Sequence, residues 1–303
     1  MSRHSVLVPN HNGVALLRRY LYDVTTIHLP VTVIDDASTD GSVAMLRREF
    51  PEVQVIERKE NGGFSKAVND GIRATGGEFV VLLNNDVEVT PGFLDSIMPL
   101  FEDESVFAAS PRVLLPSRGD LDEGAKTGFW HHGMFGTSQQ QGVTDVIPVL
   151  YATGAAAVYR RSMLEALGGF DEVYSPFYWE DADLGYRAWK RGWKSLYQPA
   201  STLYHQCSAT ISRINANLTN TIRIRNGLFF IWRNIEDRKL IGRHRFWLPL
   251  VLARRTLSLD RACIAGWRQA FPRRHEAVRA RELDSTNRKL SDAEILSALG
   301  IAC

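Results

Sequence analysis

Two short acidic stretches contain the side chains most able to carry chemistry. In the first, Asn84-Asn85-Asp86-Val87-Glu88 directly follows an apolar run. On an extended chain Asn84, Asp86 and Glu88 project to the same side. Oxygen ligands at that spacing suit Mg²⁺ or Mn²⁺, which proteins hold with a few carboxylates together with substrate phosphates. A polar turn before Pro91 explains the same residues equally well, so both interpretations stay open on local grounds.

The second acidic stretch follows three aromatic residues, 177–179, and contains Glu180, Asp181 and Asp183. The helix dipole favours acidic residues in a first turn, which is a purely structural explanation. Neighbouring aromatic rings would also desolvate a carboxylate, raise its pKa and suit it to act as a general base. Because aromatic faces also suit sugar rings, we favour a substrate site here.

Histidines are the other candidate ligands. His205 ends the strand-like run 195–205. A lone histidine is usually structural, but near Asp86 it could be a third metal ligand. His131 and His132 lie in a predicted loop, and we interpret them as a surface feature.

The elements that must position these residues follow from hydrophobic periodicity. We predict strands over 5–9, 31–36, 53–58 and 78–84, alternating with helices over 11–24, 38–50 and 65–75. Such alternation implies a parallel sheet with helices on both faces, and ligands bind these sheets beyond the carboxyl ends of the strands. The polar clusters 9–12, 35–40 and 84–86 each follow a strand, so we expect them along one rim.

Two turns near that rim allow two interpretations each. Asp35-Asp36 is either a helix-capping turn or a carboxylate that accepts a hydrogen bond from a nucleobase or ribose. Asn61-Gly62-Gly63 is a turn by default, yet its glycines would also let the backbone approach a ligand closely.

The rest of the chain is less regular. Residues 110–150 are rich in Gly, Ser and Gln and predict long loops with room for one hairpin. We expect a strand over 146–154, a helix over 181–192, and helical, basic sequence after about residue 208.

Bulk properties indicate a globular protein of a reducing compartment. The chain has 303 residues, enough for one large or two small domains, with 45% hydrophobic and 23% charged residues. Cys207, Cys263 and Cys303 are few and odd in number, which argues against a disulfide framework. The first residues enter a strand almost at once, and the apolar run 246–253 is too short to span a bilayer. We therefore expect a cytoplasmic protein.

The net charge of +2 conceals an asymmetry. Residues 221–281 contain 15 Lys and Arg against 4 Asp and Glu, a balance of +11, so the remainder carries −9. A basic tail predicts a polyanionic neighbour: a membrane surface, nucleic acid or an anionic substrate. The segments 247–257 and 262–271 mix apolar and arginine-bearing faces as interfacial helices do, although a helical cap packed on the rest of the chain is an equal alternative. The tail has no interleaved aromatic and basic motif for RNA, so we expect no nucleic acid.

Seven segments, taken in order, resemble the family 2 glycosyltransferases and, within them, the rhamnosyltransferase-like bacterial branch. They are VPNHN, VIDDASTDGS, NGGFSKAVNDGI, LLNNDVEVTPGFL, TGAAAVYRRSMLEALGGFDE, YWEDADLGYRAWKRGW and PASTLYHQCSAT, spread over about residues 5 to 212. The resemblance implies a GT-A fold, an α/β architecture whose mostly parallel sheet is flanked by helices. It also implies a nucleotide-sugar donor, Mg²⁺ or Mn²⁺, and inversion at the anomeric carbon.

On this resemblance the catalytic domain covers 1–212, with a nucleotide-binding half (1–110) and an acceptor-binding half (111–212). A helical, basic C-terminal region (213–303) follows. The expected contacts to the nucleotide-sugar are Pro9, Asn10, Asp36, Asn61, Gly63, Asn69 and Asn85. The expected metal site is Asp86, His205 and Asn84, and the expected general base is Asp181. The acceptor side is expected to be shaped by the loop 168–172, with Gly169 and Phe170, and by Trp179 and Glu180.

One residue departs from the family pattern. Asn84 stands where the first acid of the family's D-x-D motif is expected, and an amide can coordinate a metal without supplying charge. We therefore expect either weak metal affinity or a contribution from Glu88 through a water molecule.

The expected reaction is inverting transfer of a sugar to a hydroxyl of a cell-surface glycan or lipid-linked acceptor. Deoxythymidine-diphosphate rhamnose is the first expected donor, and a uridine-diphosphate hexose is the next. A sugar nucleotidyltransferase is the alternative from another class, but it should have a Gly-rich, basic loop near the N-terminus, which SVLVPNHNG lacks.

Overall fold

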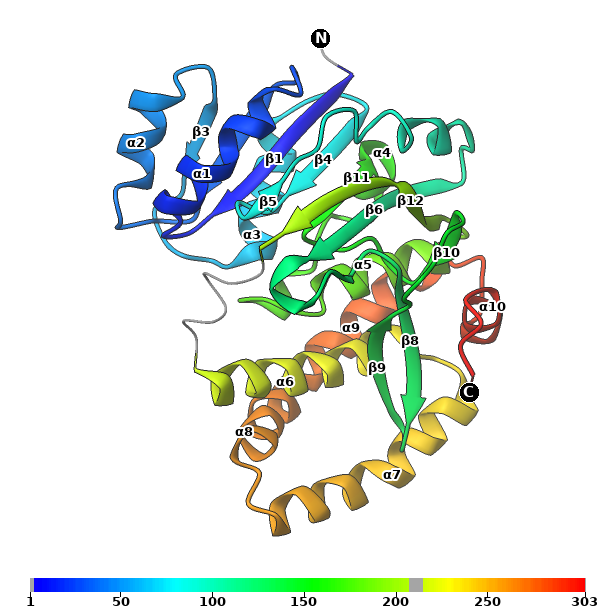
Figure 1. Cartoon of the computed structure of the whole chain (residues 1–303). Coiled ribbons are helices and arrows are strands. Elements are labelled where there is room, and N and C mark those ends of the chain that lie inside the picture. The colour runs from blue at the N-terminus through cyan, green and yellow to red at the C-terminus, as the bar shows by residue number, and fades with distance from the viewer. Residues whose placement is uncertain (1–2, 207–214, 303) are drawn as a thin grey trace.

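A mixed β-sheet forms the centre of the molecule. The computed structural model describes residues 3–206 and 215–302. In these residues ten strands form one sheet, in the order β10-β12-β6-β11-β4-β1-β2-β3, with β5 beside β12 and β7 beside β6 (Figure 1). The strands of its N-terminal half are β1 (His4–Asn10), β2 (Val31–Asp35), β3 (Gln54–Glu57) and β4 (Phe79–Leu83).

These four strands are parallel, as the alternating pattern predicts. β2 and β4 are buried at every residue, because helices cover both faces of the sheet. Helices α1 (Val14–Thr25) and α2 (Ser42–Glu49) cover one face, and α3 (Phe64–Ala74) covers the other together with α4 (Arg161–Ala166) and α5 (Glu180–Lys190). The period of two is visible in β4, where Val81 and Leu83 face α1 and α2 while Val80 and Leu82 face α3.

The second half of the sheet contains both orientations. β11 (Ala156–Arg160) is antiparallel to β4 and to β6 (Val106–Leu115), whereas β12 (Lys194–His205) is parallel to β6. The short strand β5 (Val87–Glu88) pairs with the end of β12. This pairing brings the residues after β4 beside His205.

The prediction of long loops over 110–150 was largely wrong. This region contains the end of β6, then β7 (Leu121–Asp122), β8 (Lys126–His131), β9 (Met134–Gln139) and β10 (Ile147–Val149). Strands β8 and β9 form the one hairpin for which room was expected. They are mostly half-buried and contain Gly, Ser and Thr, so the hydrophobic alternation that identifies a strand is weak there. The strand expected over 146–154 is confined to β10.

The C-terminal region is helical, as its pattern predicts. Its helices are α6 (Ala216–Asn234), α7 (Arg238–Leu257), α8 (Arg261–Ala270), α9 (Arg274–Leu283) and α10 (Asp292–Ala298). Phe229 and Phe230 of α6 join a hydrophobic core with Tyr174, Tyr186 and Phe135, so this region packs on α5 and on the hairpin. The expected boundary at 212/213 lies outside the described residues, as do Cys207 and Cys303.

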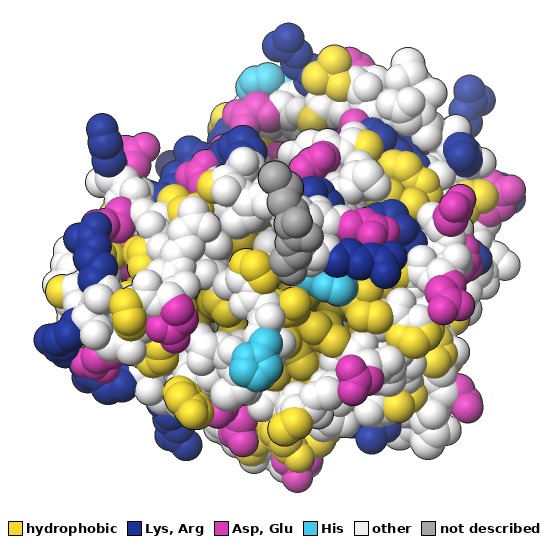
Figure 2. Space-filling model, turned by 90° about the horizontal axis from the view of Figure 1, so that it is seen from above, with side chains coloured by type: hydrophobic (Ala, Val, Ile, Leu, Met, Phe, Trp, Pro, Cys, Tyr) yellow, Lys and Arg dark blue, Asp and Glu magenta, His cyan; other side chains and the backbone are white. Residues whose placement is uncertain are grey.

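Two surfaces lie away from the strand ends that carry the polar clusters. Where the central strands begin, hydrophobic side chains gather in a hollow lined by Ile27, Phe93, Met98 and Phe101 (Figure 2). At the other extreme, α7 extends from the body as an arm beside the tip of the β8–β9 hairpin (Figure 1). Among the helices formed by residues 3–206 and 215–302, none is long and apolar enough to cross a membrane.

Candidate active site

The carboxyl ends of β1, β2 and β4 meet in one hydrogen-bonded rim. Asn10 ends β1, and its Nδ2 donates to Oδ2 of Asp35 at the end of β2 (2.9 Å). Its Oδ1 accepts from Nδ2 of Asn85, which follows β4 (2.7 Å). A Cβ at Gly13 would lie 2.3 Å from Asn85 Nδ2 and 2.4 Å from Asn10 Oδ1, so only glycine leaves room for this pair. Pro9, half-buried, is the residue before Asn10 in β1.

Asp36 organises the turn 61–63 beside this rim. Its buried carboxylate accepts hydrogen bonds from the backbone N–H of Gly62 (3.0 Å) and Gly63 (2.8 Å), and it forms an ion pair with Arg58. Gly63 has φ of +85°, and a Cβ there would lie 2.8 Å from backbone atoms of Pro176. Asn61 is exposed, and its Oδ1 accepts from Gly63 N (3.1 Å). Three of the residues expected to bind the nucleotide therefore form one cluster at the end of β2.

Asn69 has a different environment from the rim residues. Its Nδ2 donates to the carbonyl of Phe170 (2.8 Å) and its Oδ1 accepts from Phe170 N (2.9 Å). A Cβ on Gly169, which has φ of +74°, would lie 2.4 Å from Asn69 Oδ1. The expected nucleotide residue Asn69 thus fastens the expected acceptor loop 168–172 to α3.

Asp86 and His205 face each other, and a third residue holds the imidazole. His205 Nε2 lies 3.0 Å from Asp86 Oδ1, while His205 Nδ1 lies 2.6 Å from Glu123 Oε1. All three side chains are largely buried. Burial lowers the pKa of His205, but the hydrogen bonds to Asp86 and Glu123 outweigh it and raise this pKa to about 10. The protonated imidazole, which donates one N–H to each carboxylate, therefore stabilises the arrangement.

The chemistry of this group fits a divalent cation. A neutral imidazole that donates Nδ1–H to Glu123 turns the lone pair of Nε2 toward the Asp86 carboxylate. Two electron-pair donors 3.0 Å apart need a cation between them, either a proton or a metal ion. Within residues 3–206 and 215–302 no three His, Cys, Asp or Glu side chains are arranged as a complete metal site. Asp86 and His205 would thus hold an ion whose other ligands come from substrate or water. Asn84, half-buried, directly follows β4 and precedes Asp86 by two residues.

Two adjacent carboxylates begin α5 and differ in environment. Asp181 is partly exposed, and it accepts from the backbone N–H of Ala182 (2.8 Å) and Gly154 (3.2 Å). Burial raises its pKa, against the charge of Lys126 and the backbone hydrogen bonds. Glu180 is buried, and burial together with the charge of Asp181 raises its pKa to about 8. Among the described residues its Oε2 has no hydrogen-bond partner. Glu180 therefore holds a proton at neutral pH, and Asp181 is the carboxylate open to a substrate.

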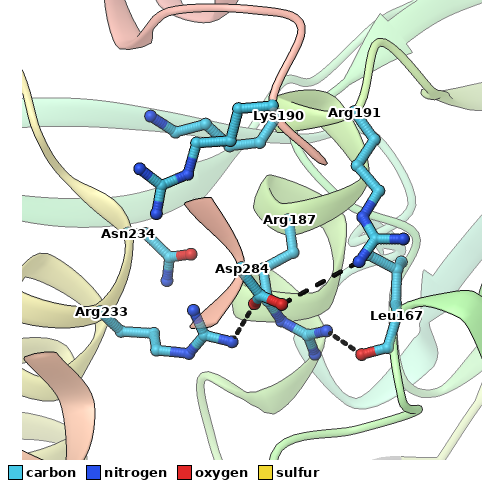
Figure 3. Close-up of a pocket in the computed structure, with 8 residues that line it drawn as sticks. Leu167, Arg187, Lys190, Arg191, Arg233, Asn234 and Asp284 are labelled. Carbon is cyan, nitrogen blue, oxygen red and sulfur yellow. Dashed lines mark hydrogen bonds and ion pairs between the residues drawn. The ribbon is translucent and has the colours of Figure 1, made fainter. Parts of the chain in front are cut away.

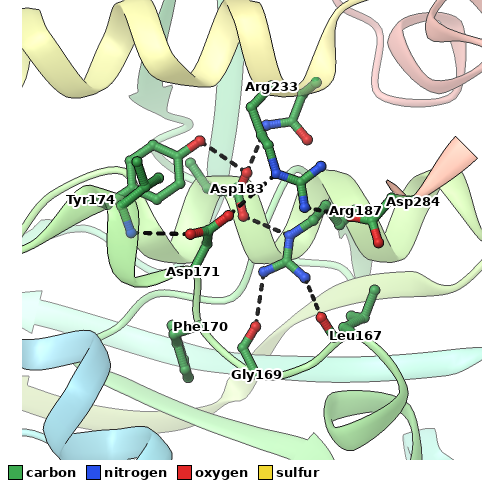
Figure 4. Close-up of polar contacts among 12 residues, drawn as sticks. Leu167, Gly169, Phe170, Asp171, Tyr174, Asp183, Arg187, Arg233 and Asp284 are labelled. Atoms are coloured by element: carbon green, nitrogen blue, oxygen red, sulfur yellow. Dashed lines mark hydrogen bonds and ion pairs between the residues drawn. The ribbon is translucent and has the colours of Figure 1, made fainter. Parts of the chain in front are cut away.

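The third acid of this stretch is structural. Asp183 is fully buried and accepts from Tyr174 Oη (2.9 Å), Asn234 Nδ2 (2.7 Å) and Arg187 Nε (2.6 Å) (Figure 4). Burial alone would raise its pKa, but Arg187 and Arg233 hold this pKa below the usual value. Arg187 also donates to the carbonyls of residues 167 and 169. Asp183 and Arg187 therefore anchor the loop that precedes the base.

Next to that anchor, α5 and α6 meet the C-terminal segment in a small, charged pocket (Figure 3). Asp284 forms an ion pair with Arg233 and lies 3.9 Å from Arg191. Lys190 lies 2.6 Å from Asp292, and Arg288 pairs with Glu236. Because each of these cations has an acidic partner, the pocket is an internal ion-pair seam.

Trp179 turns toward α6. Its Nε1 donates to the carbonyl of Arg223 (3.1 Å), and its ring lies 5.1 Å, centroid to centroid, from that of Phe230. The indole is half-buried, so one part of it stays available to a ligand.

Three site residues were missed from the sequence: Glu123, Lys126 and Tyr151. Lys126 Nζ lies 3.8 Å from Glu123 Oε2, and its charge lowers the pKa of Asp181, so it couples the Glu123–His205 pair electrostatically to Asp181. Tyr151 is buried; burial first and Asp181 second raise its pKa. The spacing of Glu123 and Lys126 was the only signal available, and it lies in the region assigned to loops.

A sheet of this order, with polar strand ends on one rim and a carboxylate at the start of a following helix, is typical of the GT-A fold of glycosyltransferases. The chain belongs to glycosyl transferase family 2: the model of that family matches residues 5–168, more than half of its length.

Several known proteins are similar to this chain. The chain is 30% identical over 227 residues to N-acetylglucosaminyl-diphospho-decaprenol L-rhamnosyltransferase of Mycobacterium tuberculosis, covering 64% of this chain and 73% of that protein. In fold it is similar to a Pyrobaculum calidifontis mannosyltransferase in complex with GDP-Man and Mn²⁺, with a TM-score of 0.57 at 18% identity over 94% of this chain and 85% of that one. It is also similar to GalNAc-T7 with UDP, GalNAc and Mn²⁺, with a TM-score of 0.59 at 18% identity over 78% of this chain and 48% of that one.

Proposed function

We propose that this protein is an inverting, metal-assisted glycosyltransferase that moves a sugar from a nucleoside diphosphate to a hydroxyl of a glycan or lipid-linked acceptor. The observation that carries the proposal is that Lys126 interacts with two groups: Glu123 beside the Asp86–His205 pair, and Asp181. On one side Asp86 and His205 face each other across 3.0 Å, and on the other the Asp181 carboxylate is partly exposed.

In the proposed reaction Asp181 accepts the proton of the acceptor hydroxyl. The acceptor oxygen attacks the anomeric carbon from the face opposite the leaving group, so a new C–O bond forms as the bond to the diphosphate breaks. One displacement inverts the anomeric configuration. Glu180, protonated at neutral pH, leaves Asp181 as the charged partner of the pair.

Asp86 and His205 would hold Mg²⁺ or Mn²⁺, with Asn84 as an uncharged neighbour; such an ion neutralises charge on the departing diphosphate. Glu123 keeps the imidazole oriented for this task. Asp36 and the turn 61–63 would receive the nucleotide base, and Pro9, Asn10 and Asn85 would line the adjoining rim. Asn69 acts through the loop 168–172, where Gly169, Phe170, Trp179 and Glu180 form the acceptor side.

For the substrates we propose rhamnose from deoxythymidine-diphosphate rhamnose and a lipid-linked acceptor, since the Mycobacterium tuberculosis relative is named for transfer of L-rhamnose to a diphospho-decaprenol lipid. A uridine-diphosphate hexose is the second candidate, because GalNAc-T7 binds UDP. The proposed organisation is a catalytic domain to about residue 212 followed by the basic helical region, acting in the cytoplasm at the inner face of the membrane.

Thermal shift with a panel of nucleotide sugars, with and without Mn²⁺, tests the donor. We expect the largest stabilisation from deoxythymidine-diphosphate rhamnose with Mn²⁺, followed by transfer to a lipid-linked acceptor. No stabilisation by any nucleotide sugar would contradict the proposal, and stabilisation by a uridine nucleotide alone would move the donor to the second candidate.

The structure of α7 supports a peripheral membrane contact. Of its 20 residues only Leu240 and His244 are buried. Its first part is held by the hairpin, where His244 Nδ1 bonds to the carbonyl of Gly133 (2.8 Å) and Trp247 lies against His132. Beyond that the arm is open: Leu257 and Leu259 are 85% and 78% exposed, beside the exposed Arg254 and Arg255. Exposed leucines next to arginines suit an anionic bilayer surface.

The two segments suggested by the sequence differ in how they pack. Residues 262–270 of the second segment lie in α8, whose Gly266 packs so closely on α6 that a Cβ there would lie 2.8 Å from the carbonyl of Thr221. Its apolar face is therefore used inside the molecule, and the proposed contact is confined to α7 and the turn 258–260.

Liposome flotation tests this contact. We expect the protein to float with anionic vesicles, and the double variant Leu257→Glu, Leu259→Glu to stay in the soluble fraction. Leu283→Glu is the matched control, because Leu283 is 73% exposed on a different helix. Equal flotation of the double variant and the control would contradict the contact.

A further inference from the structure

The turn that precedes the base contains two residues in an unfavourable backbone conformation. Tyr178 and Trp179 have φ of +71° and +80°, and neither is glycine. Such a backbone conformation is strained and persists only where its surroundings impose it. Trp179 is the N-cap residue of α5, and Glu180 and Asp181 follow at once. Whatever imposes this turn also sets where the Asp181 carboxylate lies.

One buried amide of α6 holds the turn. Asn226 is fully buried, and its Nδ2 lies 2.6 Å from the carbonyl oxygen of Tyr174, 3.0 Å from that of Phe177 and 2.8 Å from that of Tyr178. Arg225 Nε donates to Asn226 Oδ1 (2.8 Å), which fixes the amide with its NH₂ group toward these carbonyls. A second guanidinium nitrogen of Arg225 donates to the carbonyl of Ser175.

The neighbours of Asn226 on α6 complete the contact. The guanidinium of Arg223 lies 4.3 Å from the centroid of the Tyr178 ring, and the carbonyl of Arg223 accepts from Trp179 Nε1. A Cβ on Gly227 would lie 3.1 Å from the Trp179 ring, tighter than an ordinary contact. Four residues of one turn of α6, Arg223, Arg225, Asn226 and Gly227, therefore approach the turn 174–179.

The other side of the same turn contacts the turn 61–63 and the first residue of α3. Phe64 N donates to the carbonyl of Pro176 (3.0 Å), and Ser175 Oγ donates to the carbonyl of Gly62 (3.2 Å). The segment 174–179 thus lies between the nucleotide-side turn 61–63 and α6.

We propose that Asn226, oriented by Arg225, is a positioning residue for catalysis: it imposes the Tyr178–Trp179 turn and so places Asp181 against the acceptor hydroxyl. The part of α6 around Asn226 then contributes to catalysis, although α6 lies outside the segment that the family model matches. The expected effect on rate rests on the proposed function, but the proposal that Asn226 holds the turn does not.

The matched pair of variants is Asn226→Ala and Asn234→Ala. Both asparagines are buried on α6 and donate through Nδ2, but Asn234 donates to Asp183 and not to the turn. We expect Asn226→Ala to lower kcat by about 10²-fold, as displacement of a reacting group by an ångström does, and to leave the donor KM within about twofold. Asn234→Ala should lose similar thermal stability and keep kcat within about threefold of wild type.

A second readout does not depend on activity. Hydrogen exchange of the segment 175–180 should become faster in Asn226→Ala and stay near wild type in Asn234→Ala. Gly227→Ala, which presses on the Trp179 ring, serves if Asn226→Ala does not fold, with the same expected pattern. Unchanged exchange of this segment would overturn the proposal, as would an active wild type whose kcat survives Asn226→Ala. An inactive wild type with the expected exchange pattern would count against the proposed function, but not against the proposal that Asn226 holds the turn before Asp181.

Discussion

The proposed metal side (Asp86, His205 and Glu123) and the proposed base side (Glu180 and Asp181) have opposite electrostatic environments. On the metal side every charge has a partner: Asp86 contacts His205, His205 contacts Glu123, and Glu123 lies near Lys126. On the base side Glu180 is buried with an oxygen that no described residue bonds, and burial raises the pKa of both Glu180 and Asp181. A paired, preorganised group suits binding of a cation, whereas a desolvated carboxylate suits removal of a proton.

The largest effect is expected when the proposed base, Asp181, is replaced. Asp181→Asn keeps the size of the side chain and one of its two backbone hydrogen bonds, but the amide cannot accept a proton, so kcat should fall by about 10²- to 10⁴-fold. Binding of nucleoside diphosphate, measured by calorimetry, should stay within about twofold of wild type because the donor rim is untouched. Retained turnover would remove Asp181 from the role of base and end the contrast between the two sides.

A smaller effect is expected at Glu123, whose carboxylate contacts the imidazole of His205. Glu123→Ala frees the imidazole of His205, and Mn²⁺ affinity should weaken by about 10- to 100-fold. Electron paramagnetic resonance of free Mn²⁺ measures this directly. Glu88→Ala is the comparison, since Glu88 was the acid expected to help through water. If Glu88→Ala weakens Mn²⁺ more than Glu123→Ala, the orienting role belongs to Glu88 and not to Glu123.

The smallest effect concerns the pH dependence of stability. The folded state raises the pKa of Glu180 from 4.5 to about 8, so between these values it binds more protons than the unfolded chain. The contribution of Glu180 to the free energy of unfolding is therefore fully present below about pH 4.5. It is lost as pH rises toward 8, at up to about 1.4 kcal/mol per pH unit.

Thermal melts of wild type and Glu180→Gln from pH 5 to 9 test that sign. The wild type should lose stability relative to Glu180→Gln as pH rises to about 8, and the difference should then level off. Parallel curves for the two proteins would show that Glu180 has no raised pKa, and the base side would then resemble the metal side.

Much of the nucleotide half could be predicted from the sequence, because its strands are apolar runs ending in polar clusters. Asp86 and His205 were placed together by motif order, although β5 and β12 that join them lie far apart in the chain. Glu123 could not be predicted, since the strands around it are half-exposed and show little alternation. Composition and spacing did not separate Asp181 from Asp183, and only the family resemblance favoured Asp181. The structural difference lies in Arg187, Tyr174 and Asn234, which reach Asp183 through tertiary packing.

The sequence also indicated Asn69 as a nucleotide neighbour, a role that stays a prediction, while its hydrogen bonds to Phe170 are visible only in the fold. The contact of α6 with the turn before Asp181 had no signal at all, because Asn226 is a single buried amide in a helix.

The most direct test of two separate sides is Mn²⁺ binding, followed by electron paramagnetic resonance with nucleoside diphosphate present, in wild type, His205→Ala and Asp181→Asn. Our account predicts that His205→Ala loses most of the Mn²⁺ affinity while Asp181→Asn keeps it within about twofold. Equal affinity in both variants, whether retained or lost, would contradict the division of the site into a metal side and a base side.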